Sequence, residues 1–95
     1  MSINLKKVPN TPGVYKFFNN HEIIYIGKAK DLKKRVASYF GKSQKDRKTS
    51  QIRLLTDKVE TFTTKNEVEA LLLEQMLIKE NKPKFNILLR DDKTY

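Results

Sequence analysis

Residues 13–27 read GVYKFFNNHEIIYIG, and this stretch decides the fold. Residues 14–18 and 23–27 are runs of β-branched and aromatic residues, and the polar segment between them has the composition of a turn. The stretch therefore predicts a β-hairpin. With residues 19–21 as its loop, Tyr15 would lie directly across from Tyr25 on one face. His21, the one histidine of the chain, falls in the turn, which argues against histidine base catalysis and a multi-histidine zinc site.

After the hairpin, the apolar residues change to helical spacing. Asp31 can cap a helix over residues 32–40, whose apolar stripe must face a core. The polar, basic residues 42–48 are expected to form a loop. Residues 49–57 predict a short helix with Ile52 and Leu55 pointing inward.

The remaining part predicts one more strand and one more helix. Residues 59–64 are rich in β-branched residues and predict a third strand. Asn66 with Glu69 three positions later resembles a capping box, which would start a helix that runs to about Glu80 and ends before Pro83. The order strand, strand, helix, helix, strand, helix indicates an α/β fold with a small three-stranded mixed or antiparallel sheet flanked by helices.

Composition limits the class of protein. The chain has 95 residues, 38% of them hydrophobic, so we expect one domain with one core. The absence of cysteine excludes a disulfide framework and a thiolate zinc site. No apolar run approaches the ~20 residues that span a bilayer, and the first residues lack an apolar signal core. We therefore expect a monomeric, cytoplasmic protein without a membrane partner.

Positive charge is concentrated in one segment. The formal net charge is +9, and residues 28–48 hold nine basic residues against two acidic ones. Such a field attracts polyanions, so nucleic acid is the leading candidate partner, with a solvated basic surface as the alternative. The basic residues expected to contact DNA are Lys28, Lys30, Lys33, Lys34, Arg35, Lys42, Lys45, Arg47 and Lys48.

Glu74 stands out in the last predicted helix. At helical spacing it shares a face with aliphatic residues, namely Ala70, Leu71, Leu77 and Ile78. Leu72 and Met76 lie on the opposite side, so we expect this helix to be buried on two faces. An ionised carboxylate in such surroundings must be paired, hydrogen-bonded or bound to a metal. A salt bridge and a metal site explain Glu74 equally well from this helix alone.

Several motifs together resemble one nuclease family. The chain resembles the GIY-YIG nucleases at Gly13-Val14-Tyr15, at Tyr25-Ile26-Gly27-Lys28, and then at Arg35 and Tyr39. Val14 is a mild departure from the isoleucine of the family motif. The segments 67–74, 77–79, 83–86 and 88–93 resemble the UvrC branch of that family, which acts in bacterial nucleotide excision repair. The resemblance covers essentially residues 9–95.

The resemblance implies a site. Glu74 would bind a single divalent cation, magnesium or manganese, and Tyr25 would act as general base toward a water molecule. Lys28, Arg35 and the cation are expected to lower the pKa of the Tyr25 phenol, and hydrogen bonding to Tyr15 is expected to orient its oxygen. The residues that would complete the site are Tyr15, Gly27, Lys28, Arg35, Tyr39 and Asn86.

The resemblance also implies a function. It predicts a metal-dependent endonuclease domain that hydrolyses a phosphodiester bond of damaged duplex DNA on the 3′ side of a lesion. We expect residues 1–95 to be the N-terminal domain of a longer protein, which would bind UvrB through other regions. The alternatives are a freestanding, structure-specific GIY-YIG endonuclease and a non-catalytic DNA-binding module.

Overall fold

The predicted hairpin forms the centre of the domain. In the computed structural model, which describes residues 7–40 and 47–88, β1 (Gly13–Asn19) and β2 (Glu22–Ala29) pair antiparallel. Their loop has two residues, Asn20 and His21, both with positive φ (52° and 71°), as the central residues of a type I′ turn require. The backbone N–H of Asn20 donates to Asp57 Oδ2 at 2.8 Å, which fixes the turn. His21 is thus a turn residue, as predicted.

The register of the hairpin differs from the prediction. An irregularity beside Phe17 places Tyr25 across from Phe17, and Tyr15 across from Gly27. The predicted direct pairing of Tyr15 with Tyr25 is wrong, because the loop is one residue shorter and β2 has one extra residue, Ile24. The two tyrosines still share a face, with ring centroids 6.2 Å apart.

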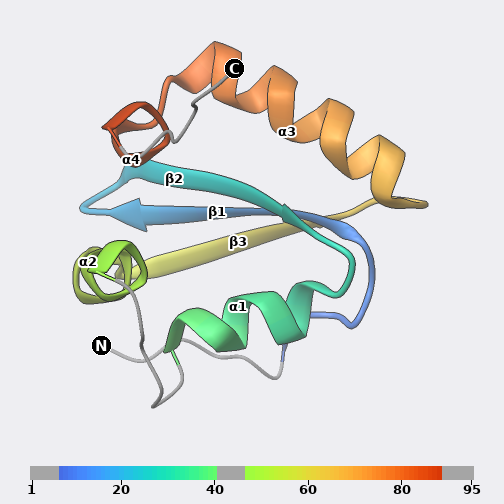
Figure 1. Cartoon of the computed structure of the whole chain (residues 1–95), viewed down its shortest axis with the longest axis horizontal. Coiled ribbons are helices and arrows are strands. Elements are labelled where there is room, and N and C mark those ends of the chain that lie inside the picture. Colours follow the sequence, from blue (N-terminus) through green and yellow to red (C-terminus); the bar gives the residue numbers. More distant parts are fainter. Residues whose placement is uncertain (1–6, 41–46, 89–95) are drawn as a thin grey trace.

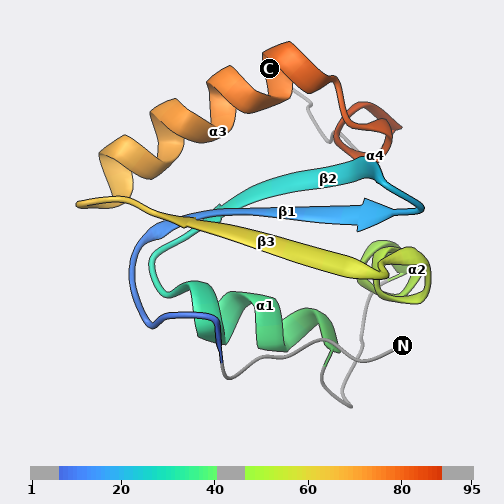
Figure 2. The ribbon, with the colours of Figure 1, turned by 180° about the vertical axis from the view of Figure 1, so that it is seen from behind.

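The sheet is antiparallel throughout and lies between helices. β3 (Lys58–Thr63) pairs with β1, so the strand order is β2-β1-β3 and β2 is an edge strand. Figures 1 and 2 show α3 (Glu67–Asn81) across one face of the sheet, with α1 (Leu32–Phe40) and α2 (Arg47–Leu55) on the opposite side. α4 (Lys84–Leu88) lies beside β2. The predicted α/β fold with a three-stranded sheet is confirmed.

Local signals set the helix boundaries well. α1 has its predicted bounds, and the N–H of Lys34 donates to Asp31 Oδ1 at 3.2 Å, as expected of a cap. At the start of α3, Asn66 Oδ1 accepts from the N–H of Glu69 at 2.9 Å. Glu69 Oε1 in turn accepts from the N–H of Lys65 at 3.0 Å. α3 ends at Asn81, and the left-handed backbone of the C-cap residue Lys82 directs its N–H to the carbonyl of Ile78.

Three local expectations were wrong. α2 begins at Arg47, inside the segment expected to be a loop, and Leu55 is 40% exposed rather than buried, although Ile52 is buried as predicted. α3 is not buried on two faces, since Leu72 and Met76 are 64% and 52% exposed. α3 packs on the sheet through one side only, and no described element covers the other side.

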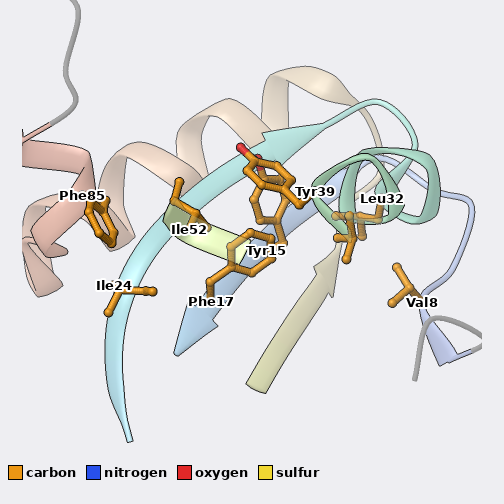
Figure 3. Packing of buried hydrophobic residues seen from close by; sticks show 9 residues of the cluster. Val8, Tyr15, Phe17, Ile24, Leu32, Tyr39, Ile52 and Phe85 are labelled. Carbon is orange, nitrogen blue, oxygen red and sulfur yellow. The ribbon is translucent and has the colours of Figure 1, made fainter. Parts of the chain in front are cut away.

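Two apolar clusters hold the layers together. The larger lies between the sheet and α1, α2 and α4, and Figure 3 shows Tyr15 and Phe17 at its centre, beneath Tyr39. The smaller lies between the sheet and α3 and contains Val14, Ile26 and Ala70. Because alternate residues of β1 enter opposite clusters, both faces of this central strand are buried. No helix in the described part of the chain is long and apolar enough to span a bilayer.

Candidate active site

Three tyrosines from three elements meet on the α1 side of the sheet. The ring centroid of Tyr15 lies 5.8 Å from that of Tyr39, and Tyr25 lies 6.3 Å from Tyr39. The hydroxyls of Tyr15 and Tyr39 are 3.2 Å apart and hydrogen-bonded. Arg35, one turn before Tyr39, places its guanidinium carbon 5.9 Å from the ring centroid of Tyr39. Residues separated in sequence thus form one cluster of hydroxyls beside a cation.

Gly27 is required by the position of Tyr15. The side chain of Tyr15 lies directly over Gly27, its cross-strand partner. A Cβ at Gly27 would overlap the Tyr15 hydroxyl and Cζ, and would lie 2.9 Å from Cε1. Gly27 of the Tyr-Ile-Gly motif therefore makes room for Tyr15 of the Gly-Val-Tyr motif.

Burial favours the protonated form of the three phenols. It raises the pKa of Tyr15, Tyr25 and Tyr39 above the ordinary value for tyrosine. For Tyr25, the neighbouring Tyr39 and the negative charge of Glu74 raise the pKa further, while Arg35 acts in the opposite direction. Arg35 lowers the pKa of Tyr25, as expected, but burial has the larger effect, so the pKa lies above the ordinary tyrosine value.

Asn86 pairs with the edge of the sheet at β2. Its side-chain Nδ2 donates to the carbonyl of Ile26 at 2.9 Å, and its Oδ1 accepts from the N–H of Ile26 at 2.8 Å. The amide therefore pairs with β2 as a further strand would, between Tyr25 and Gly27. α4, which presents Asn86, was not predicted. Its neighbours Pro83 and Phe85 are both buried and anchor it.

Glu74 lies on the other side of the β2 edge. Its carboxylate is half-buried, and burial raises its pKa, against the lowering effects of Gln75 and Lys28. Gln75 Nε2 donates to Glu74 Oε1 at 3.2 Å. The one ion pair among the described residues joins Lys58 to Glu60, so no described side chain forms a salt bridge with Glu74. The charge of Glu74 acts on Tyr25 across the strand edge.

The surroundings of Glu74 fit magnesium or manganese. Both ions retain several waters and take one or two protein carboxylates, and Glu74 supplies one that lacks a neutralising ion pair among the described side chains. Within the same part of the chain, no group of three or more acidic, histidine or cysteine side chains gathers. The described residues therefore form no metal site with three or more such ligands, which leaves Glu74 as a candidate carboxylate ligand.

The predicted DNA-binding residues do not all lie on one surface of the described structure. A groove of about 510 Å³ lies between the start of α1 and the first turn of α3. Its basic lining residues are Lys28, Lys30, Lys34 and Arg35, and the others are Ala29, Asp31, Ser38, Glu67 and Ala70. Lys33 is half-buried and does not line it. Lys42 and Lys45 lie outside the described residues, and Arg47 and Lys48 lie in α2 with undescribed side chains. Ser38, four residues after Lys34, was not predicted, although the helical spacing indicates it.

Comparison with known proteins agrees with this geometry. The sequence model of the family described as the UvrC-like GIY-YIG domain matches residues 11–87. UvrABC system protein C of Cytophaga hutchinsonii is 55% identical over 93 residues, which is 96% of this chain and 16% of that protein. The same protein of a Psychrobacter species is 53% identical over 92 residues, 96% of this chain and 15% of that protein. The chain thus spans less than a fifth of the length of these relatives.

A solved structure has the same fold. The GIY-YIG N-terminal endonuclease domain of UvrC from Thermotoga maritima, bound to its catalytic cation magnesium, superimposes with a TM-score of 0.79 and 43% identity. The match covers 86% of this chain and 90% of that domain. Since the family match spans most of the chain and full-length relatives are more than half identical over it, the chain belongs to the UvrC-like GIY-YIG domain family.

Proposed function

We propose that this chain is a magnesium- or manganese-dependent endonuclease domain that hydrolyses a phosphodiester bond of damaged duplex DNA, 3′ to the lesion, in bacterial nucleotide excision repair. The observation that carries the proposal is the convergence of three tyrosine hydroxyls, Arg35 and the half-buried carboxylate of Glu74 around one edge of β2. The domain would act in the cytoplasm as part of a longer protein, which binds UvrB through regions outside this chain.

Solved relatives support the roles of these residues. Variants of the Thermotoga maritima domain at three tyrosines and one asparagine were each solved with the catalytic divalent cation bound. The three tyrosines are spaced along that chain as Tyr15, Tyr25 and Tyr39 are spaced here. We assign the same cluster to the active site of this chain.

The residues divide the work of hydrolysis among them. Glu74 would hold the cation, which supplies positive charge to the phosphoryl oxygens and offsets the negative charge that raises the pKa of Tyr25. As the phenolate, which the cation and Arg35 would favour, Tyr25 would take a proton from the attacking water. Arg35 can bind a phosphoryl oxygen through its planar guanidinium, and Lys28 adds a second cation near Glu74. The remaining residues would position these groups. Asn86 bonds to the backbone of Ile26, Tyr15 and Tyr39 bond to each other, and Gly27 makes room for the ring of Tyr15.

A reconstituted incision assay tests the proposal. The longer protein carrying this domain, with UvrB on a lesion-bearing duplex, should nick the strand 3′ to the lesion with magnesium or manganese and stop with chelator. Tyr25→Phe should abolish the nick and retain DNA and metal affinity, because only the acid–base oxygen is lost. An active Tyr25→Phe variant would place the base elsewhere, and cation-independent nicking would refute the metal role.

The isolated domain should be a poor nuclease. A domain of 95 residues offers few phosphate contacts, and nonspecific affinities fall roughly between 10⁻⁴ and 10⁻⁶ M. Effective incision then depends on a damage-bound partner that raises the local concentration of the strand. Strong cutting of undamaged duplex by residues 1–95 alone would favour a freestanding GIY-YIG endonuclease instead.

A further inference from the structure

The groove between α1 and α3 is larger than the proposed chemistry requires. It holds four cationic side chains and continues from the active site, since Lys28 and Arg35 belong to both. We propose that this groove, called here the α1–α3 groove, binds the sugar–phosphate unit next to the scissile phosphate, with Lys30 and Lys34 as its phosphate contacts. The inference rests on the proposed nuclease function and extends it to a neighbouring nucleotide.

The charges of the groove favour an anion. Lys28, Lys30, Lys34 and Arg35 face two carboxylates, Asp31 and Glu67. Asp31 is already engaged, because its Oδ1 accepts from Asn10 Nδ2 at 2.9 Å and from the N–H of Lys34. Glu67 lies in the first turn of α3, where a carboxylate interacts favourably with the helix dipole. The cations therefore remain in excess and available to a phosphate.

The size and lining of the groove indicate which part of a nucleotide enters. A volume of about 510 Å³ is in the range of sites for small organic ligands and exceeds the need of a bare phosphate. The described residues that line it include no aromatic side chain, and Ala29 and Ala70 are its apolar ones. Bases bind single-strand grooves by stacking on aromatic rings. The groove therefore suits the sugar–phosphate backbone and gives binding without sequence preference.

The position of the groove fixes its relation to the cut. Arg35 lies beside Tyr39 and lines the groove one turn from Ser38. Lys34 and Ser38 are four residues apart and line the groove from the same helix, while Lys30 lies just after β2. A strand whose scissile phosphate meets Arg35 would thus carry its next phosphate along α1 toward Lys34.

Binding measurements on the 95-residue chain test the inference without cleavage. The probe is a fluorescein-labelled duplex of arbitrary sequence, titrated by anisotropy between 50 and 200 mM KCl (about the range in which phosphate contacts dominate). Lys30→Ala with Lys34→Ala should flatten the slope of log K against log salt by about 1 to 2. Lys58→Ala with Lys79→Ala removes the same charge from β3 and the end of α3, and should leave the slope unchanged.

A second readout locates the DNA on the wild-type domain. In NMR titrations with the same duplex, the amides of Ala29, Ser38 and Ala70 should shift together with that of Gly27. Equal slopes for the two double variants, or shifts that spare Ala29, Ser38 and Ala70, would overturn the inference. Circular dichroism confirms that both variants are folded, which is expected because the replaced lysines are exposed.

Incision by the longer protein tests the neighbouring phosphate and separates the two proposals. A neutral methylphosphonate beside the scissile phosphate should raise KM about 10-fold for the wild type and have little effect on the Lys30→Ala, Lys34→Ala variant, because the contact is already lost. An equal effect on both proteins contradicts the groove while leaving the nuclease function intact. Absence of metal-dependent incision by the wild type contradicts the function, and the binding data still decide the groove.

Discussion

Replacing Gly27 with alanine should destabilise the domain, although the position lies in a strand where glycine is usually unfavourable. The ring of Tyr15 is 1% exposed and packs 5.0 Å from Phe17 and 5.8 Å from Tyr39, centroid to centroid, so it has no open space into which it can move. The new Cβ would overlap the Tyr15 hydroxyl and Cζ. Tyr15 or the backbone of β2 must therefore shift.

The magnitude follows from two opposing effects. Overpacking of a well-packed core costs about 1–3 kcal/mol. Loss of the conformational freedom of glycine in the unfolded chain returns about 0.4–1 kcal/mol. With both effects taken near the middle of their ranges, the net loss is about 1–2 kcal/mol, or about 4–16 °C in Tm for a domain of this size. Overpacking wins, so the substitution is destabilising.

Thermal and urea unfolding followed by circular dichroism measure this loss. Glu22→Ala, at an exposed position of the same strand, is the matched control and should change Tm little. Combining Gly27→Ala with Tyr15→Leu removes the atoms that clash, so the double variant should be more stable than the sum of the two single effects. A Gly27→Ala variant with wild-type Tm, or purely additive effects in the double variant, would refute the steric argument.

Three further predictions concern the site. Glu74→Gln should abolish cation-dependent incision and cation binding by calorimetry. It should be at least as stable as the wild type at neutral pH, because burial raises the pKa of Glu74. Protonated Glu74 contributes stability below the ordinary carboxyl pKa, and this contribution is lost as pH rises through the raised value. The stability advantage of the variant should therefore vanish in acid, and its persistence there would contradict this account. Asn86→Ala should cost about 1–3 kcal/mol, because it leaves the N–H and carbonyl of Ile26 unpaired, and hydrogen exchange at the Ile26 amide should accelerate; unchanged exchange would contradict the pairing. Tyr39→Phe should cost about 1 kcal/mol through loss of the buried hydrogen bond to Tyr15, measured by urea unfolding, whereas a neutral result would show that this bond adds nothing to stability.

The features that depend on local chemistry were predictable from the sequence. The bounds of α1 and the start of α3 follow from capping by Asp31 and Asn66, which act within four residues. The shared face of Tyr15 and Tyr25 also follows. Tyr15 pairs with Gly27 instead of Tyr25, and residues two apart in a strand point to the same face of the sheet.

The features that depend on tertiary packing were not predictable. α4 has five residues, too few to show helical periodicity, and forms where Pro83 and Phe85 are buried. Leu72 and Met76 have the spacing of core residues, but nothing in the described chain covers them. The pKa of Tyr25 depends on a balance between burial and the charge of Arg35, which requires the positions of both. The irregularity in β2 likewise has no signal in the sequence of the turn.

The hydrogen bonds of Asn86 have a consequence for solubility as well as for the site. β2 ends the sheet, and an edge strand with free N–H and carbonyl groups can recruit a strand from another molecule. Asn86 occupies both groups of Ile26 and thereby interrupts the row where an incoming strand would pair. Replacing Asn86 would reopen this edge, so intermolecular β-pairing and aggregation at high concentration should accompany the loss of stability.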